Sequence, residues 1–92
     1  MIALHSRLRR RRNILAQRVS DKLVLLNLES GEYYALDEVG GKVWDLCDGV
    51  RTVSESAAVI AAEYDALPET IETDVLELVG ELLREKMVEG EG

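Results

Sequence analysis

The side chains that could carry out chemistry are few and are scattered along the chain. Cys47 is the single cysteine, and it stands among Val43, Trp44 and Leu46, an apolar setting typical of a buried, unreactive thiol. His5 is the single histidine, so the chain offers neither a histidine-dependent triad nor a multi-histidine metal site. No nucleophile–base pair, metal-ligand spacing or cluster of perturbed carboxylates stands out. The sequence therefore predicts a protein that is not an enzyme and that has no cofactor.

A short strand is the better candidate for a working surface, because a backbone can bind as well as a side chain. Ser30-Gly31 is a tight-turn dipeptide between two strand-like runs, which indicates a β-hairpin. The second run, Tyr33 to Leu36, suits a pleated surface. Asp37 follows it directly, and its carboxylate can cap the first turn of a helix. One short strand thus leads from a hairpin straight into a helix.

The strands before it predict a three-stranded antiparallel meander over residues 13–36. Residues 13–19 alternate loosely and form the first strand, and residues 22–28 form the second. The second strand has apolar residues on both faces, so we expect it to be the middle one. The third strand, 33–36, then has one open edge with unpaired amides and carbonyls.

Three helices are predicted after the meander. Residues 37–47 carry an apolar stripe. Gly40-Gly41 in the first turns indicates close approach of another backbone, that of the sheet, since each glycine costs about 1 kcal/mol in a helix relative to alanine. These glycines do not fit a phosphate-binding loop, which is Gly-rich between a strand and a helix. A capping box at Thr52–Glu55 opens a second helix that runs to Tyr64. Pro68 suits the first turn of a third helix, about 69–85.

The third helix has an unusually broad apolar face. At 100° per residue its apolar side chains cover an arc of about 160°, wider than the stripe needed to face one core. Two interpretations stay open: the helix is wedged between two packing partners, or one flank lines a groove. The residues of this arc are Ile71, Val75, Leu76, Leu78, Val79, Leu82 and Leu83.

Length and charge restrict the remaining possibilities. The chain of 92 residues makes one domain, and its net charge of −7 is unevenly distributed. Residues 1–12 hold five arginines and no acid, whereas residues 13–92 hold six basic and eighteen acidic side chains, a net charge of −12. Such a domain repels nucleic acid. The arm at residues 1–12 is either solvated and flexible or a contact for nucleic acid or an acidic partner.

Nothing in the sequence predicts a membrane protein. No apolar run is long enough to span a bilayer, and the segment after the arginines lacks the apolar core of a signal peptide. The expected location is the cytoplasm.

Three strands followed by three helices, the last two joined by a short turn, is the layout of an α+β domain of the winged helix-turn-helix type. Within this layout, residues 13–89 contain an ordered series of motifs: Tyr33–Asp37, Gly40–Leu46, Asp48-Gly49, Thr52–Glu55, Tyr64-Asp65 and Ile71–Leu76. Through this series the chain resembles the PqqD-like family of precursor-peptide recognition domains, also called RiPP recognition elements (RiPPs are ribosomally made, post-translationally modified peptides). Lys86 departs from the family pattern, because members often have a glycine that ends the last helix at this position.

The resemblance implies a stand-alone, non-catalytic adaptor that holds the leader segment of a precursor peptide for a maturation enzyme. In the family the leader adds as a strand to the third strand of the sheet and contacts the third helix. The implied partners are the leader and either a leader peptidase and cyclase of a lasso-peptide pathway or a radical-SAM enzyme. The alternative is a winged-helix DNA-binding regulator. The implied peptide-binding residues are Glu32, Tyr33, Tyr34, Ala35, Leu36, Ile71, Val75, Leu76, Val79, Leu82 and Leu83.

Overall fold

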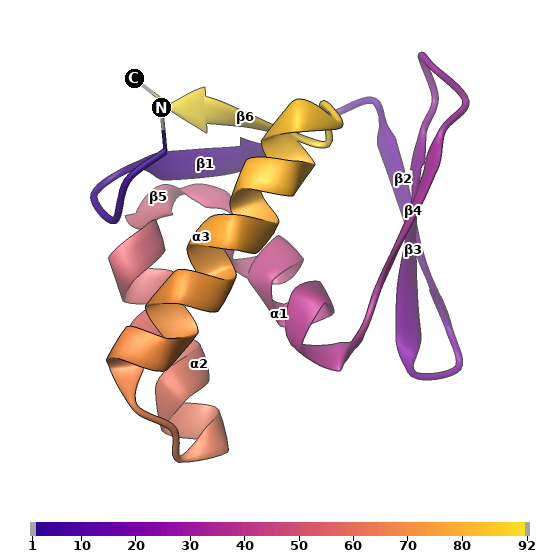
Figure 1. The fold of residues 1–92 in the computed structure, drawn as a ribbon. Coiled ribbons are helices and arrows are strands. Elements are labelled where there is room, and N and C mark those ends of the chain that lie inside the picture. Colours follow the sequence, from indigo (N-terminus) through magenta and orange to yellow (C-terminus); the bar gives the residue numbers. More distant parts are fainter. Residues whose placement is uncertain (1, 92) are drawn as a thin grey trace.

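Two antiparallel three-stranded sheets and three helices make up the α+β fold (Figure 1). The computed structural model describes residues 2–91. The elements in chain order are β1 (Arg7–Arg10), β2 (Ile14–Val19), β3 (Lys22–Asn27), β4 (Tyr33–Leu36), α1 (Glu38–Leu46), β5 (Asp48–Thr52), α2 (Val53–Tyr64), α3 (Pro68–Arg84) and β6 (Val88–Glu91).

The predicted meander is confirmed as the sheet β2–β3–β4, with β3 in the middle. Leu23 and Leu25 of β3 are buried on its inner face. Asn27, at the end of β3, is also buried, and its side-chain oxygen accepts hydrogen bonds from the amides of Glu29 (2.9 Å) and Ser30 (3.1 Å). This buried amide fixes the hairpin that places β4, because a buried polar group needs partners.

The sheet β5–β1–β6 differs from the expectation of an unassigned basic arm, because Arg7–Arg10 is its central strand. Leu8 on this strand is buried in the core. Arg10 donates from Nη1 to the carbonyl oxygens of Trp44 (3.2 Å) and Asp45 (2.6 Å), at the end of α1. A positive side chain at a helix C-terminus is favourable. The sequence pattern did not predict this strand, because only one of its four side chains is apolar.

Both predicted helix caps at α1 and α2 are present. The Asp37 carboxylate accepts a hydrogen bond from the Gly40 amide at 2.8 Å. Thr52 and Glu55 form the reciprocal capping box at the start of α2. The third helix begins at Pro68, one residue earlier than predicted, without a side-chain cap. These local signals set where each helix enters the core.

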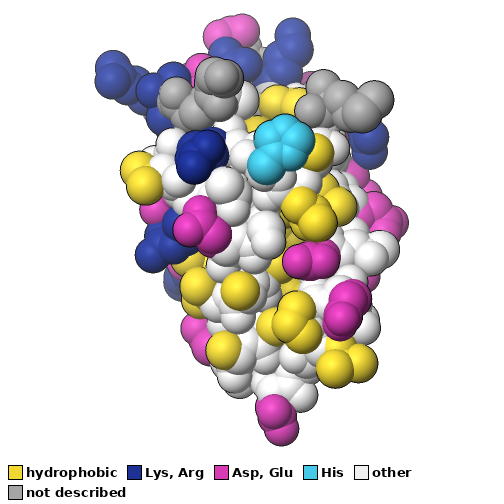
Figure 2. Space-filling view, turned by 90° about the vertical axis from the view of Figure 1, so that its left-hand side faces the viewer, with side chains coloured by type: hydrophobic (Ala, Val, Ile, Leu, Met, Phe, Trp, Pro, Cys, Tyr) yellow, Lys and Arg dark blue, Asp and Glu magenta, His cyan; other side chains and the backbone are white. Residues whose placement is uncertain are grey.

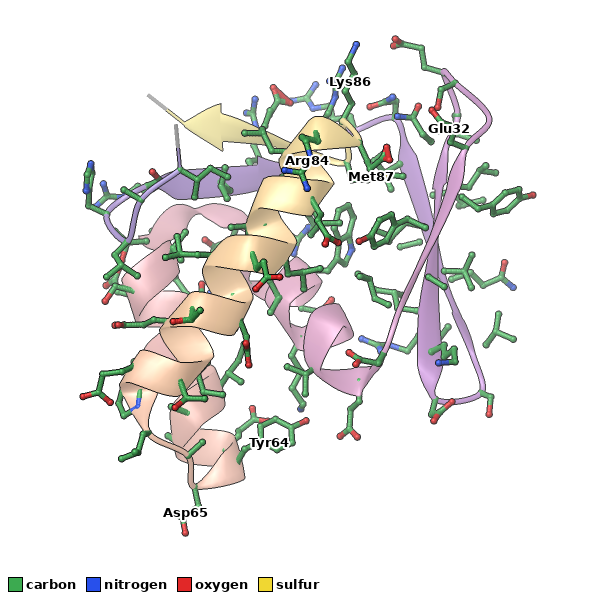
Figure 3. All side chains as sticks on the ribbon, viewed as in Figure 1. Glu32, Tyr64, Asp65, Arg84, Lys86 and Met87 are labelled. Atoms are coloured by element: carbon green, nitrogen blue, oxygen red, sulfur yellow. The ribbon has the colours of Figure 1, made fainter. Side chains whose placement is uncertain are left out.

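At the C-terminal end of α3, Lys86 is the position at which the sequence departs from the family pattern, and its backbone conformation is one that favours glycine. Lys86 has a φ of 58°, in the left-handed region that glycine adopts most easily. Its amide donates to the Leu83 carbonyl (3.1 Å), and the Met87 amide donates to the Leu82 carbonyl (2.9 Å). Figure 3 shows Lys86 at the upper end of α3, where the chain turns into β6. A lysine therefore occupies a backbone position suited to glycine.

The core lies where the three helices meet the two sheets. Its most deeply buried large side chains come from both sheets, from all three helices and from the turn before β6: Leu25, Val43, Ile60, Val75, Val79, Leu82, Met87 and Val88. On the face in Figure 2, Lys and Arg side chains gather mainly at the top, by β1 and β6. Among the residues that the structure describes, none of the helices is both long and apolar enough to cross a membrane.

Candidate functional site

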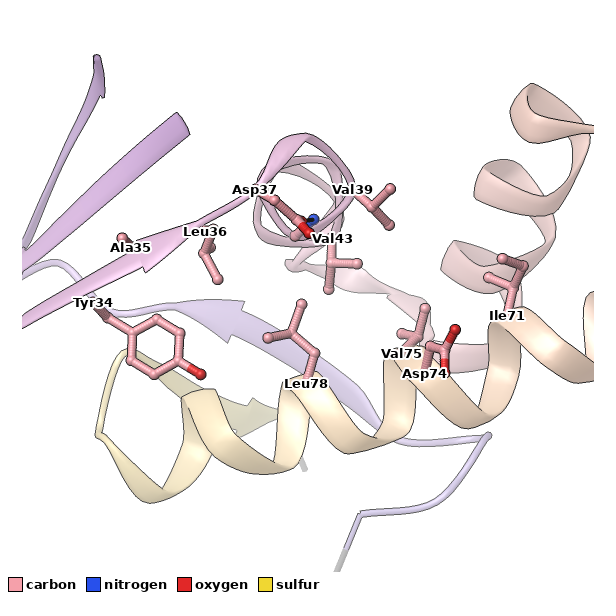
Figure 4. A pocket seen from close by; sticks show the side chains of 11 residues that line it. Tyr34, Ala35, Leu36, Asp37, Val39, Val43, Ile71, Asp74, Val75 and Leu78 are labelled. Atoms are coloured by element: carbon pink, nitrogen blue, oxygen red, sulfur yellow. Dashed lines mark hydrogen bonds between the residues drawn. The ribbon is translucent and has the colours of Figure 1, made fainter. Parts of the chain in front are cut away.

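A groove of about 460 Å³ lies between β4, the first turns of α1 and the middle of α3 (Figure 4). It forms because β4 runs directly into α1, while α3 lies on the opposite side of the groove from both (Figure 4). Most of its wall is aliphatic, and its acidic side chains are those of Asp37 and Asp74. Its lining residues are Tyr34, Ala35, Leu36, Asp37, Val39, Gly40, Val43, Ile71, Asp74, Val75 and Leu78.

The backbone of β4 is open along one edge beside this groove, because β4 is the last strand of its sheet. The Asn27 amide donates to the Glu32 carbonyl (2.9 Å), and hydrogen-bonded pairs alternate along an antiparallel ladder. The polar backbone groups of Tyr34 therefore face β3, whereas those of Tyr33 and Ala35 face outward. The edge presents two amides and two carbonyls to an incoming chain.

The side chains of β4 divide between the two faces of the sheet. Tyr34 and Leu36 point toward α3, and Leu78 points back toward them (Figure 4). Tyr33 points the other way and is 71% exposed. A chain added to the edge of β4 would alternate in the same manner, with every second side chain directed into the groove.

The floor of the groove belongs to the core and is therefore rigid. Leu36, Val43 and Val75 are each 3% exposed or less. Gly40 allows α1 to lie close to β4, since a Cβ at this position would come within 3.1 Å of the Leu36 Cβ. At Gly41 a Cβ would meet the Leu23 side chain of β3 at 3.6 Å. The glycine pair does lie against the sheet, but the nearest atoms all belong to side chains, so the prediction that another backbone approaches closely is wrong.

One polar contact joins β4 to α3 beside the groove. The Tyr34 hydroxyl donates a hydrogen bond to the Glu81 carboxylate. This hydrogen bond, together with partial burial and the negative charges of Glu81 and Glu85, raises the pKa of Tyr34 to about 12. The phenol is therefore protonated, and able to donate, at neutral pH.

The expected peptide-binding residues do not all lie at the groove. Tyr34, Ala35, Leu36, Ile71 and Val75 line it. The remaining six lie elsewhere: Glu32 and Tyr33 are exposed on the hairpin and outer face, Val79 and Leu82 are buried in the core, Leu76 packs against the core, and Leu83 is 37% exposed outside the groove.

This distribution shows that both interpretations of the broad apolar arc hold in part. The arc is wide because α3 packs against the core through Val79 and Leu82 while it faces the groove through Ile71, Val75 and Leu78. Periodicity finds the arc but does not divide it. The residues that the sequence did not assign to the site are Asp37, Val39, Gly40, Val43, Asp74 and Leu78; of these, Leu78 lies within the predicted arc.

Cys47 is buried as predicted, at 6% exposure. Burial raises the pKa of its thiol to about 12, so the reactive thiolate is scarce at neutral pH. Among residues 2–91, no group of three or more His, Cys, Asp or Glu side chains is arranged to hold a metal ion. What the groove can do chemically is bind a chain through backbone hydrogen bonds and apolar contacts.

Comparison with known sequences points to one family. The family model "Coenzyme PQQ synthesis protein D (PqqD)" matches residues 22–88. The PqqA binding protein of Xanthomonas oryzae pv. oryzae is 37% identical over 71 residues, which are 77% of this chain and 75% of that protein. The bifunctional coenzyme PQQ synthesis protein C/D of Methylorubrum extorquens is also 37% identical over 71 residues, but this chain spans only 18% of its length.

Solved structures agree with the sequence comparison. The solution structure of the PqqD part of Methylobacterium extorquens PqqCD, a stand-alone RiPP recognition element, matches 97% of this chain with a TM-score of 0.82 and 30% identity, and 95% of that chain is covered. TbiB1 in complex with the TbiA(beta) leader peptide matches 91% of this chain and 98% of its own, with a TM-score of 0.80 and 28% identity.

A lasso peptide synthetase B1 complexed with the leader peptide matches 89% of this chain and 96% of that chain, with a TM-score of 0.77 and 28% identity. These findings support the α+β fold and give no support to the DNA-binding alternative. The sequence match and the shared fold lead to one conclusion: this chain belongs to the PqqD family.

Proposed function

We propose that this chain is a non-catalytic adaptor that binds the leader segment of a ribosomally made precursor peptide and presents it to a maturation enzyme. The leader adds as a further strand to the open edge of β4, and alternate leader side chains enter the groove beside α3. The observation that carries this proposal is the outward-facing backbone of Tyr33 and Ala35 next to an apolar groove. Strand addition needs both features: the edge gives hydrogen bonds and the groove gives side-chain pockets.

Affinity in this arrangement comes from a small number of anchors. A leader of about ten residues loses conformational entropy when it is ordered, which limits the net affinity. Burial of two or three aliphatic or aromatic leader side chains, at about 1.5–3 kcal/mol each, offsets that cost. Because Leu36, Val43 and Val75 are already fixed in the core, the protein itself loses little freedom on binding. Submicromolar binding is therefore within reach.

The relatives support this function and leave two pathways open. Proteins described as PqqA binding proteins support a precursor peptide as the partner. Complexes of structural relatives with leader peptides, one of them a lasso peptide synthetase B1, support the leader as the bound segment. The enzyme partner is then a radical-SAM enzyme of cofactor maturation or the peptidase and cyclase of a lasso-peptide pathway. The expected compartment remains the cytoplasm.

The test is binding of synthetic leaders to groove variants. Short reading frames beside the gene supply candidate precursors, and their leaders are labelled and titrated by fluorescence anisotropy. Leu78→Asp places a charge in the apolar groove and should weaken binding at least tenfold, since an unpaired charge in an apolar site is costly. Leu83→Asp is the matched control on the same helix, because Leu83 lies outside the groove. Thermal unfolding checks that both variants stay folded.

A second variant isolates the backbone contribution. Ala35→Pro removes an outward-facing amide, and proline is tolerated on an edge strand. We expect this variant to fold and to lose leader binding. Normal binding by both Ala35→Pro and Leu78→Asp would overturn the proposed function.

A further inference from the structure

We propose that Asp74 makes the groove selective for peptides with a Lys or Arg two residues from an apolar anchor, on the same face of the bound strand. This inference rests on the proposed function and specifies which peptides the groove accepts. It assigns to Asp74 a specificity-determining role, through a direct ion pair with the peptide.

Asp74 is a charged side chain on an apolar stretch of the α3 surface. Its neighbours on the groove-facing side of the helix are Ile71, Val75 and Leu78, which lie three residues before, one after and four after it. Figure 4 shows the Asp74 carboxylate beside Val75, on the wall opposite the start of α1. The Asp74 side chain is exposed and lines the groove, so its carboxylate is accessible to a chain that enters the groove.

No described residue of the chain pairs with Asp74. Its carboxylate makes no hydrogen bond or ion pair within residues 2–91. Two cations of the neighbouring elements are already engaged, since Lys42 pairs with Glu63 (2.7 Å) and Arg18 pairs with Asp45 (3.0 Å). Asp74 is therefore free to meet a cation brought by a ligand.

Asp37, the other acidic residue that lines the groove, is a helix cap. The Asp37 carboxylate accepts the Gly40 amide at 2.8 Å and caps α1. It adds negative charge to the groove lining, and its position is fixed by the cap. The two carboxylates belong to different walls of the groove, Asp37 at the start of α1 and Asp74 on α3, and only Asp74 has both oxygens without a partner among the described residues.

Strand and helix geometry set the spacing. Side chains on one face of a strand are about 7 Å apart, and one turn of a helix rises about 5.4 Å. An apolar peptide side chain between Leu36 and Leu78 therefore places the next inward-facing side chain about one helical turn along α3, beside Asp74. A Lys or Arg at this position can lay its aliphatic stem over Ile71 and Val75 while its charged end reaches the carboxylate.

A peptide selection tests the inference without knowledge of the natural leader. The full chain is immobilised and used to select binders from a random dodecapeptide display library. Wild type, Asp74→Asn and the matched control Glu77→Gln are selected in parallel. Glu77 is an exposed acid on the same helix and does not line the groove. We expect Lys or Arg to be enriched two residues from an aliphatic or aromatic residue for wild type and for Glu77→Gln, and this enrichment to disappear for Asp74→Asn.

Affinities of one selected peptide give the quantitative test. Replacement of its Lys by the neutral isostere norleucine should weaken binding to wild type about fivefold, the upper range for a solvent-accessible ion pair. The same replacement should change binding to Asp74→Asn less than twofold. Asp74→Lys should reverse the preference, so that a Glu peptide binds better than the Lys peptide.

The contrary outcomes separate this inference from the proposed function. Peptides that bind wild type and fail to bind Ala35→Pro, yet show no basic enrichment, would overturn the role of Asp74 and leave strand addition intact. An equal loss from norleucine in wild type and Asp74→Asn would do the same. Failure to select any peptide whose binding depends on the β4 edge would overturn both.

Discussion

The Tyr34 hydroxyl donates a hydrogen bond to the Glu81 carboxylate, and this contact ties β4 to α3 beside the groove. The hydrogen bond and the adjoining negative charge raise the pKa of Tyr34 to about 12, above the ordinary value of 10.0. The folded state therefore retains the phenolic proton over a pH range in which the unfolded chain has lost it. The contribution of this contact to stability is complete below pH 10 and is lost as the pH rises toward 12.

Comparison of wild type with Tyr34→Phe measures this contribution. The difference in their urea midpoints should be constant between pH 7 and pH 9.5 and should shrink steadily between pH 10 and pH 12. The phenylalanine variant provides the control for general alkaline destabilisation, which affects both proteins. A difference that does not change across pH 10–12 would show that the tyrosine–glutamate contact does not stabilise the folded chain.

Gly40 and Gly41 should respond in opposite ways to the same substitution. At Gly41 a Cβ meets neighbours at 3.4 Å or more, so Gly41→Ala should stabilise the chain by up to about 1 kcal/mol through helix propensity. At Gly40 a Cβ would lie 3.1 Å from the Leu36 Cβ and 3.3 Å from the Asp37 Oδ1. Gly40→Ala should therefore be less stable than Gly41→Ala by about 1–2 kcal/mol, because β4 or α1 must shift. Urea unfolding of the two variants provides the comparison; equal stabilities would contradict the close packing of α1 on β4.

Lys86 offers a stabilising substitution away from the groove. Its φ of 58° is unfavourable for a side chain with a Cβ, so Lys86→Gly should raise the free energy of unfolding by about 0.5–1 kcal/mol. Arg84→Gly, in the last turn of α3, should instead lower it by about 1 kcal/mol, because glycine is a poor helix former. Destabilisation by both glycines, measured by thermal unfolding, would show that the lysine is not strained.

Local sequence signals predicted most of the elements that carry the groove. The Ser30-Gly31 turn, the Asp37 cap and the Thr52–Glu55 capping box depend on residues a few positions apart, and each lies where it was expected. The second sheet could not be predicted in this way. Arg7–Arg10 pairs with segments about 40 and 80 residues away, and its single buried side chain, Leu8, gives no periodic signal.

The groove itself depends on the orientation of α3 about its own axis, which decides which side chains of the apolar arc face the core. A broad apolar arc is visible in the sequence, but burial of Val79 rather than Leu78 follows from the position of α3 between α2 and α1. Asp74 lies at the boundary of this arc, where a charged residue is ordinary on a solvated face. Asp74 lines a groove only because β4 and α1 lie opposite it, and the sequence pattern of α3 does not contain this information.

Amide hydrogen exchange of β4, followed residue by residue by NMR, tests strand addition most directly. In the free protein, the amides of Tyr33 and Ala35 should exchange rapidly and those of Tyr34 and Leu36 slowly, because only the latter pair with β3. With a saturating leader peptide, Tyr33 and Ala35 should become protected as well. If both amides still exchange rapidly when the peptide is bound, the peptide does not add to β4, and the central proposal is wrong.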